Sequence, residues 1–328
     1  MTITRRRTLK TSVASLAALY LTGSQAGAQV WPSKPIKIVC AFLAGGLVDL
    51  FARVYGEYLS QKLGQPVVVE NRAGASGSIA AQALKASPPD GYTLLVAITA
   101  TLAQNRVLYR NLPYDPDKDF VLISYMPSGH LPFVAGKITR ASSLEEFVAY
   151  ARENETNVGT WGAGTYAHIV VEELNKQFGL QIKPVHYRGE APMWQDLAAG
   201  VLQAAMGTFP NAVNAVHSGA GQAVAVPLAG RNSKLPNVPT FIEQGLTSKV
   251  FALVPYVCLV GQAGIPQEIV DRLSTLMVEG GKSERVQKLL DAFGIEQSAQ
   301  GHLAFKELYE RETPIWVDSV TALGLTPQ

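Results

Sequence analysis

Two glycine-rich segments hold the residues whose types and spacing best suit ligand chemistry. The first, FLAGGLVD at 42–49, joins an apolar run to a helical pattern. Adjacent glycines let a backbone approach a ligand without a Cβ atom in the way, and the first N–H groups of a helix have no partner within it. Those donors and the helix dipole favour an anion. The same pattern is also typical of a plain strand-to-helix turn capped by Asp49.

The second segment, GTWGAGTYAHIVVEEL at 159–174, repeats this layout more than 110 residues later. It follows a predicted strand and begins a predicted helix, with Gly162, Gly164 and Thr165 at the junction. If the two segments belong to two halves of the protein, their helix starts face each other across a cleft, where ligands bind in open α/β sheets. A small carboxylate or dicarboxylate fits such an arrangement.

Nucleotide, catalytic and metal chemistry receive less support from the sequence. It contains neither the P-loop pattern nor, in the proper place, the dinucleotide fingerprint, and neither a nucleophile elbow nor a zinc-protease motif. His168 and Glu172 lie one helical turn apart and could share a metal, but a third ligand is not evident. A polar pair at a helix start is the simpler interpretation. We therefore predict no catalytic residue, no metal and no cofactor.

The elements that position these segments follow from the hydrophobic pattern. Short β-rich runs alternate with amphipathic helical segments, which indicates parallel strands with crossover helices. We expect strands at 36–42, 67–70, 93–98, 133–135, 157–160, 184–187, 203–207, 223–228 and 254–260. We expect helices at 49–63, 79–86, 144–153, 166–178, 193–199, 266–280, 283–293 and 300–322.

The strands at 36–42 and 254–260 are uniformly apolar, as strands buried on both faces of a parallel sheet are. The last 75 or so residues are therefore expected to return to the first half of the fold. We predict an α/β protein of two lobes, each a mostly parallel sheet flanked by helices. Lobe 1 comprises 29–126 plus 251–328, and lobe 2 comprises 127–250. The two crossings between lobes form a hinge over a ligand cleft.

The N-terminus carries the pattern of an export signal. Arg5 to Arg7 and Lys10 precede a short apolar run, and an A-x-A site ends at Ala28. These features predict a cleaved signal peptide at 1–28, because the run is too short for a membrane span of about 20 residues. The basic cluster also approximates a twin-arginine signal, so both the Sec and the twin-arginine routes stay open. We expect a soluble periplasmic protein.

Charge and cysteine content narrow the function further. Without residues 1–28 the chain has 24 Lys and Arg against 26 Asp and Glu. This weakly acidic balance gives no electrostatic case for nucleic acid. Cys40 and Cys258 both lie in apolar runs. An oxidising compartment permits a disulfide between them, whereas two buried free thiols are the plainer interpretation.

Eight stretches of the mature chain carry a family resemblance. They are WPSKPIKIVCAFLAGGLVDLFAR, LGQPVVVENRAGASGSIAA, DGYTLLVAITATLAQN, LPYDPDKDF, GTWGAGTYAH, VHYRGEAPMWQDLAAG, SKLPNVPTFIEQG and GQAGIPQEIVDRL. In this order they resemble the Bug-type, TctC-like extracytoplasmic receptors of tripartite tricarboxylate transport systems. The resemblance covers essentially the whole mature chain.

The resemblance implies a periplasmic binding protein of the type II-like fold that captures a small organic acid. Its implied partners are that acid and the membrane subunits of a tripartite transporter, and it implies a monomer that is not an enzyme. An orphan sensory receptor of the same fold remains an alternative. A carboxylate-processing enzyme is a further one.

The resemblance also implies which residues bind the ligand. Family members hold a ligand carboxylate largely through backbone amides and bridging waters in the first glycine-rich loop. Carried over position by position, the expected ligand-binding set is Phe42, Ala44, Gly45, Gly46, Leu47, Asp49, Thr99, Thr101, Gln104, Gly162, Ala163, Gly164, Thr165, His168, Tyr187 and Thr208.

Departures from the family pattern bear on the ligand. Leu43, Leu47 and Val48 make the first loop unusually apolar. Gln203 stands where many relatives carry Asp, which weakens the expectation of a ligand ammonium group paired there. We hypothesise a carboxylate with an apolar or aromatic body rather than a compact polyacid.

Overall fold

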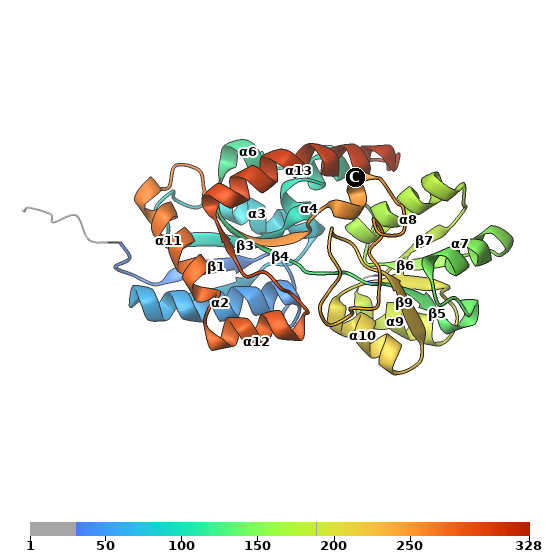
Figure 1. Cartoon of the computed structure of the whole chain (residues 1–328). Coiled ribbons are helices and arrows are strands. Elements are labelled where there is room, and N and C mark those ends of the chain that lie inside the picture. The colour runs from blue at the N-terminus through green and yellow to red at the C-terminus, as the bar shows by residue number, and fades with distance from the viewer. Residues whose placement is uncertain (1–30, 188) are drawn as a thin grey trace, which may run out of the picture.

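The protein is built on two separate β-sheets flanked by helices, as the computed structural model shows for residues 31–187 and 189–328 (Figure 1). The predicted signal peptide at 1–28 lies outside the described residues. No helix in those ranges is long and apolar enough to cross a membrane.

The first sheet has six strands and mixed direction. Its core is parallel, because β1 pairs in parallel with both β2 and β3, while β10 runs antiparallel to β3 and β4. The order across the sheet is β11 (Gln300–Gly301), β4 (Phe120–Pro127), β10 (Tyr256–Gln262), β3 (Thr93–Ile98), β1 (Ile36–Cys40) and β2 (Val67–Asn71).

Helices cover both faces of the first sheet. One face packs on α2 (Leu47–Leu63), α11 (Gln267–Gly280) and α12 (Glu284–Ala292), and the other on α3 (Ser78–Lys85) and the first half of α13 (His302–Ala322). In α2 the buried residues Phe51, Tyr55 and Leu59 recur at helical spacing, so one stripe of the helix faces the core. Burying each such side chain contributes about 2 kcal/mol.

The second sheet has five strands and is also mixed. Its order is β7 (Lys183–His186), β6 (Asn157–Thr160), β8 (Ala204–Met206), β5 (Phe133–Gly136) and β9 (Gly221–Ala225), with β5 antiparallel to both of its neighbours. The helices on its two faces are α7 (Leu144–Glu153) and α8 (Tyr166–Phe178) on one, and α9 (Glu190–Ala198) and α10 (Phe209–His217) on the other. Shorter helical turns lie at Ala75–Gly77, Thr99–Leu102 (α4), Asn105–Leu108 (α5), Pro116–Asp119 (α6), Lys137–Thr139 and Lys249–Ala252.

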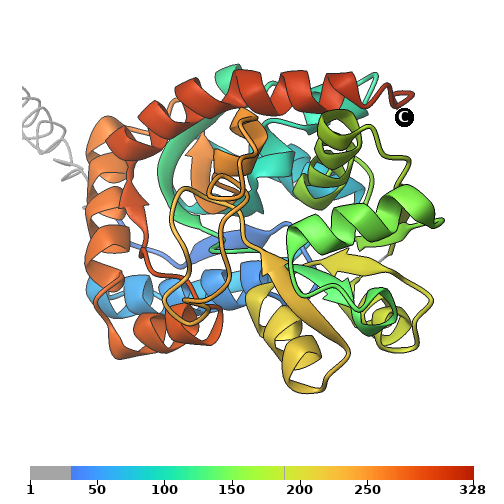
Figure 2. The same cartoon turned by 45° about the vertical axis from the view of Figure 1, so that its right-hand side comes forward.

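The C-terminal helix α13 packs on both sheets. Phe305 and Leu308 join the core of the first sheet, whereas Trp316 and Val320 join the core of the second. The Trp316 ring meets that of Tyr166 edge-on at 5.5 Å, and Figure 2 shows the end of α13 above α8. Besides the two chain connections between the sheets, α13 is thus a third link. The lobe limits drawn from the sequence stay a prediction.

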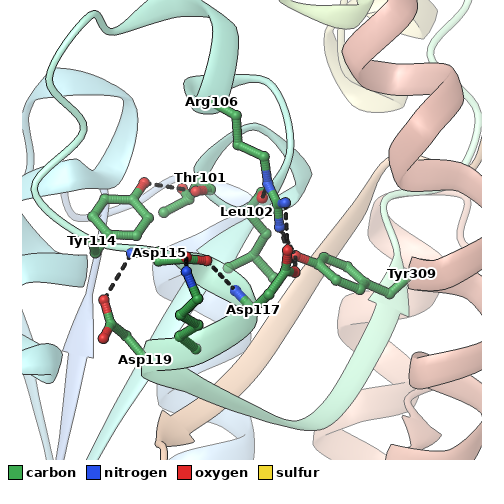
Figure 3. A network of polar contacts seen from close by, with 9 residues as sticks. Thr101, Leu102, Arg106, Tyr114, Asp115, Asp117, Asp119 and Tyr309 are labelled. Atoms are coloured by element: carbon green, nitrogen blue, oxygen red, sulfur yellow. Dashed lines mark hydrogen bonds and ion pairs between the residues drawn. The ribbon is translucent and has the colours of Figure 1, made fainter.

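An ion-pair network fixes the first half of α13 (Figure 3). The Arg106 guanidinium donates to both carboxylate oxygens of Asp117 at 2.6 Å, and it also donates to the Tyr309 hydroxyl, which donates to Asp117 at 2.8 Å. Since these residues lie on α5, α6 and α13, the network joins three helices. It holds the helix on the first sheet while the helix end reaches the second.

The structure adds to and corrects the elements expected from the sequence. The strand β4 and the helix α10 were not predicted, and the two sheets are mixed rather than mostly parallel, because β10 and β5 run antiparallel to their neighbours. Uniform apolarity reports burial on both faces of a strand and does not report its direction. Cys40 and Cys258 are free and buried. They pack on opposite faces of the first sheet, with β3 between their strands, so no bridge joins them.

Candidate functional site

A cavity of about 650 Å³ lies between the two sheets. Loops that follow four strands reach it, because the lining includes Gly46 after β1, Thr99 after β3, Thr165 after β6 and Thr208 after β8. In open α/β sheets this carboxyl-end position is where ligands bind. Each of these loops also starts a helix, so several helix N-termini open at one space.

The first glycine-rich loop is held by its own helix. The Gly45 N–H donates to Oδ2 of Asp49 at 3.0 Å, and that buried carboxylate also accepts from Asn71 at 2.8 Å and from Arg53 at 3.0 Å. Burial alone would raise the pKa of Asp49, but the hydrogen bonds from Arg53, Asn71 and Gly45 lower it. Asp49 therefore stays ionised, and the hydrogen bond that it accepts from the Gly45 N–H fixes the conformation of the loop.

The start of α2 is left open toward the cavity. Its N-cap is Gly46, which has no side chain to accept from the first-turn N–H groups. A Cβ added at Gly45 or Gly46 would meet no atom within 4 Å. This end of the cavity thus offers unpaired backbone donors and room for an anion.

The second glycine-rich loop has the same construction. The Gly164 N–H donates to Nδ1 of His168 at 3.0 Å, and the Thr165 hydroxyl donates to the Gly162 carbonyl at 2.7 Å. No side chain caps α8, since the Thr165 hydroxyl accepts from none of the first-turn N–H groups. The helix starts of α2 and α8 are therefore alike in their free donors.

The His168 imidazole is a neutral acceptor in this loop. Burial and the nearby His186 lower the pKa of His168 to about 4. Its Nε2 lies 3.8 Å from Glu172, and no cluster of three metal-ligating side chains occurs among the described residues. His168 and Glu172 are thus a polar pair at a helix start.

Eight of the sixteen residues in the expected ligand-binding set line the cavity. They are Phe42, Gly45, Gly46, Leu47, Thr99, Gln104, Thr165 and Thr208. Gln104 is buried, and its side-chain oxygen has no hydrogen-bond partner among the described residues. It is therefore a polar group still available to a ligand.

The other eight do not line the cavity. Ala44, Gly162, Ala163 and Gly164 belong to the two glycine-rich loops without lining the cavity, and Asp49 and His168 hold those loops. The Thr101 hydroxyl donates to the Ser76 carbonyl, and that of Tyr187 donates to Asp196 at 2.6 Å. Positions in a sequence motif do not separate the residues that shape a loop from those that face its ligand.

The residues that depart from the family pattern also divide into those that line the cavity and those that do not. Leu47 and Val48 line the cavity, whereas Leu43 does not and is 76% exposed. The Gln203 side chain accepts from the Asn157 N–H at 2.8 Å, which joins β8 to β6 away from the cavity. Gln203 therefore says nothing about a ligand ammonium group.

Aromatic side chains form much of the wall, and sequence reasoning missed all of those outside the first loop. Trp161, Tyr166, Tyr256, Phe293 and Trp316 line the cavity. Trp161 and Tyr166 belong to the second glycine-rich segment, where only its glycines, Ala163, Thr165 and His168 were expected to bind, whereas Tyr256, Phe293 and Trp316 lie far from either segment, so no local motif marks them. The mostly apolar wall suits a ligand body of the same character.

Another helix that starts at the cavity, α10, differs from α2 and α8. Its N-cap Thr208 gives its N–H and its hydroxyl to the carboxylate of Glu190, which also lines the cavity. Glu190 was not among the expected residues. The one available signal was an acidic residue directly after the glycine that follows a predicted strand, which is also typical of an ordinary helix start.

Two mixed α/β sheets, linked by two connections and a shared helix, with a cavity at their strand ends, define a two-lobed solute-binding protein. Comparison with known proteins gives the family. The sequence model of the tripartite tricarboxylate transporter family receptor matches residues 51–322, and the chain belongs to this family.

Individual relatives and solved structures agree with this membership. The chain is 32% identical over 270 residues to protein BugT of Bordetella pertussis, covering 81% of this chain and 82% of that protein. The structure of R. palustris Rpa4515 with adipate is 28% identical, with a TM-score of 0.80, over 91% of this chain and 100% of that one. MatC from Rhodopseudomonas palustris with bound malate is 28% identical, with a TM-score of 0.73, over 88% and 100%.

These findings confirm the predicted family and the two-lobed binding-protein fold. They also settle the class of activity, because the members of this family are solute receptors rather than enzymes. Receptors of this family are periplasmic and work with the membrane subunits of tripartite transporters.

Proposed function

We propose that this protein captures a small organic carboxylate with an apolar or aromatic body in the cavity between its sheets. The observation that carries the proposal is the pair of uncapped helix starts, α2 and α8, which open at one cavity from opposite sheets. Their N–H groups suit a carboxylate, and the aromatic wall suits an apolar body. Adipate and malate in two related structures support the carboxylate.

In this proposal Gly46, Leu47, Thr165 and Gln104 contact the ligand directly. Asp49 and His168 act behind them as positioning residues, since each holds the loop glycine whose N–H it accepts. The receptor works as a monomer in the periplasm, reaches it through the signal at 1–28, and delivers its ligand to the transporter's membrane subunits. Lobe 1 and lobe 2, with the limits predicted from the sequence, close on the ligand.

A ligand screen tests the proposal. The mature protein is melted with aliphatic and aromatic carboxylates, with their amides and with amino acids, and each stabilising compound is confirmed by calorimetry. A ligand at 100 times its Kd adds about 2.7 kcal/mol to the stability, which a thermal shift detects. Stabilisation by amides alone, or by none of a broad panel of acids, would contradict the carboxylate. Recovery of the unchanged ligand after long incubation is the expected result for a receptor.

A further inference from the structure

Glu190 is the charged side chain of the cavity wall, and no second one occurs among the described lining residues. It lies in the first turn of α9 and is half-buried. Because it lies beside the N-cap of α10, it determines which hydrogen-bonding groups a ligand meets in that part of the cavity.

The Glu190 carboxylate occupies the donors of that end. Oε1 accepts from the Thr208 N–H at 3.0 Å, and Oε2 accepts from the Thr208 hydroxyl at 2.8 Å. Oε2 also accepts from the Asn211 amide at 2.7 Å and from the Trp194 indole N–H at 3.1 Å. The protein's own carboxylate thus takes the hydrogen bonds that a ligand carboxylate would need there.

The four helices α2, α8, α9 and α10 that start at the cavity are therefore unequal. The starts of α2 and α8 present no charged side chain to the cavity, whereas Glu190 lies in the first turn of α9 and its carboxylate accepts from the N-cap Thr208 of α10. A ligand with one carboxylate places it at the open starts. A second carboxylate beside Glu190 would meet a like charge in a partly desolvated space.

We infer that Glu190 makes this cavity selective for monocarboxylates over dicarboxylates of the same length, an inference that rests on the proposed function. Oε1 accepts one short hydrogen bond and can accept another. The ligand group favoured beside Glu190 is therefore neutral and donates a hydrogen bond, as a primary amide does. The chain would then differ from the related receptor whose structure contains adipate.

Matched ligands isolate the effect of the second charge. The mature protein is titrated by calorimetry at pH 7.5 with unbranched dicarboxylates of four to eight carbons and with the monoamide of each. These pairs share length and shape and differ by one negative charge. We expect the monoamide to bind at least tenfold more tightly at the length that fits the cavity.

Variants assign the preference to Glu190. Glu190→Gln keeps the shape and removes the charge, so it should reduce the preference at least tenfold, mainly by improved dicarboxylate binding. Glu190→Ala is the second variant, and circular dichroism and thermal melting check both folds. Glu310→Gln, an exposed position on α13, is the matched control and should leave the preference unchanged.

The outcomes separate this inference from the function on which it rests. Equal binding of both ligands of every pair by the wild type, or a preference that survives in a folded Glu190→Gln, overturns the inference while carboxylate binding stands. If both variants fail to fold, the wild-type preference alone decides. Absence of binding by any acid, in wild type and variants, overturns the proposed function and the inference together.

Discussion

The two glycine-rich loops reach the same geometry with different chemistry. In each, a glycine with a left-handed backbone donates its N–H over 3.0 Å to a buried side chain four residues later, Gly45 to Asp49 and Gly164 to His168. One acceptor is an ionised carboxylate held by Arg53, and the other is a neutral imidazole. The shared requirement is thus an acceptor at that position and not a particular residue.

Because the two acceptors differ, the two loops respond differently to pH and to substitution. The carboxylate of Asp49 is supported by two further donors and keeps its charge well into acid, because its pKa is lowered. The imidazole of His168 accepts only while it is unprotonated. The loop at α2 is therefore the more robust of the two, and the loop at α8 is sensitive to acid and to substitution.

The largest expected effect comes from Gly46→Val at the robust loop. Its φ of −85° suits any residue and its Cβ position is open, so the fold and the melting temperature should persist. The branched side chain would occupy the space over the α2 start, and carboxylate affinity should fall at least a thousandfold, about 4 kcal/mol. Calorimetry with a ligand from the screen measures it. Retained affinity would remove α2 from the site.

The next effect, in stability, distinguishes the two acceptors by pH. His168 is held neutral with its pKa lowered from 6.5 to about 4, first by burial and then by His186. Between these values the unfolded chain binds a proton that the native chain does not. The free energy of unfolding should therefore fall by up to roughly 3 kcal/mol as the pH drops from 6.5 to 4.

His168→Asn removes that proton linkage, so its unfolding free energy should lose less over the same pH range. His217→Asn, at an exposed position on α10, is the control and should follow the wild type. Chemical denaturation at several pH values gives the comparison. Parallel curves for His168→Asn and the wild type would show that another group controls this loop in acid.

A smaller loss should follow from Gly164→Ala in the second loop. Its φ is +71°, and the new Cβ would lie 2.6 Å from the Leu108 side chain on α5. Gly219→Ala pays the same backbone strain at φ +73° without any atom within 4 Å. We expect losses of about 2 kcal/mol and about 1 kcal/mol, measured by urea denaturation. Equal losses would show that Leu108 on α5 moves aside at no cost in unfolding free energy.

The smallest effect tests which apolar residue of the first loop selects the ligand. Leu47→Ala removes apolar contact from the cavity wall and should weaken an apolar carboxylate about fivefold, about 1 kcal/mol. Leu43→Ala changes a side chain that is 76% exposed and outside the wall. Its affinity should match the wild type. Calorimetry on both variants decides, and an equal loss in both would place Leu43 in the bound state.

Much of the fold followed from the sequence because its strands and helices differ clearly in period. The helix at 166–178 and the strand at 93–98 were predicted with the limits that the structure has. The strand β4 was missed because the polar segment that precedes Phe120 ends directly where the strand begins. The helix α10 was missed although Pro210 in its first turn and the three-residue spacing of Asn211, Asn214 and His217 are both signals of an amphipathic helix.

The site could be located but not assigned residue by residue. Both loops were found because glycine and helix starts leave local signals. Trp316 and Tyr256 reach the cavity from distant parts of the chain, and only tertiary packing brings them there. Glu190 is separated from Thr208 by a helix and a strand, so their hydrogen bonds have no signature in the local sequence.

The aromatic wall makes the protein its own optical reporter. Of its four tryptophans, Trp161 and Trp316 line the cavity, and the Trp194 indole donates to Glu190 beside it. Trp31 packs on Tyr92, next to β3 of the first sheet, and does not line the cavity. Intrinsic emission should therefore shift or quench when a solute displaces water from these indoles. Receptor occupancy can then be followed without a label, and Trp31→Phe would lower the constant background.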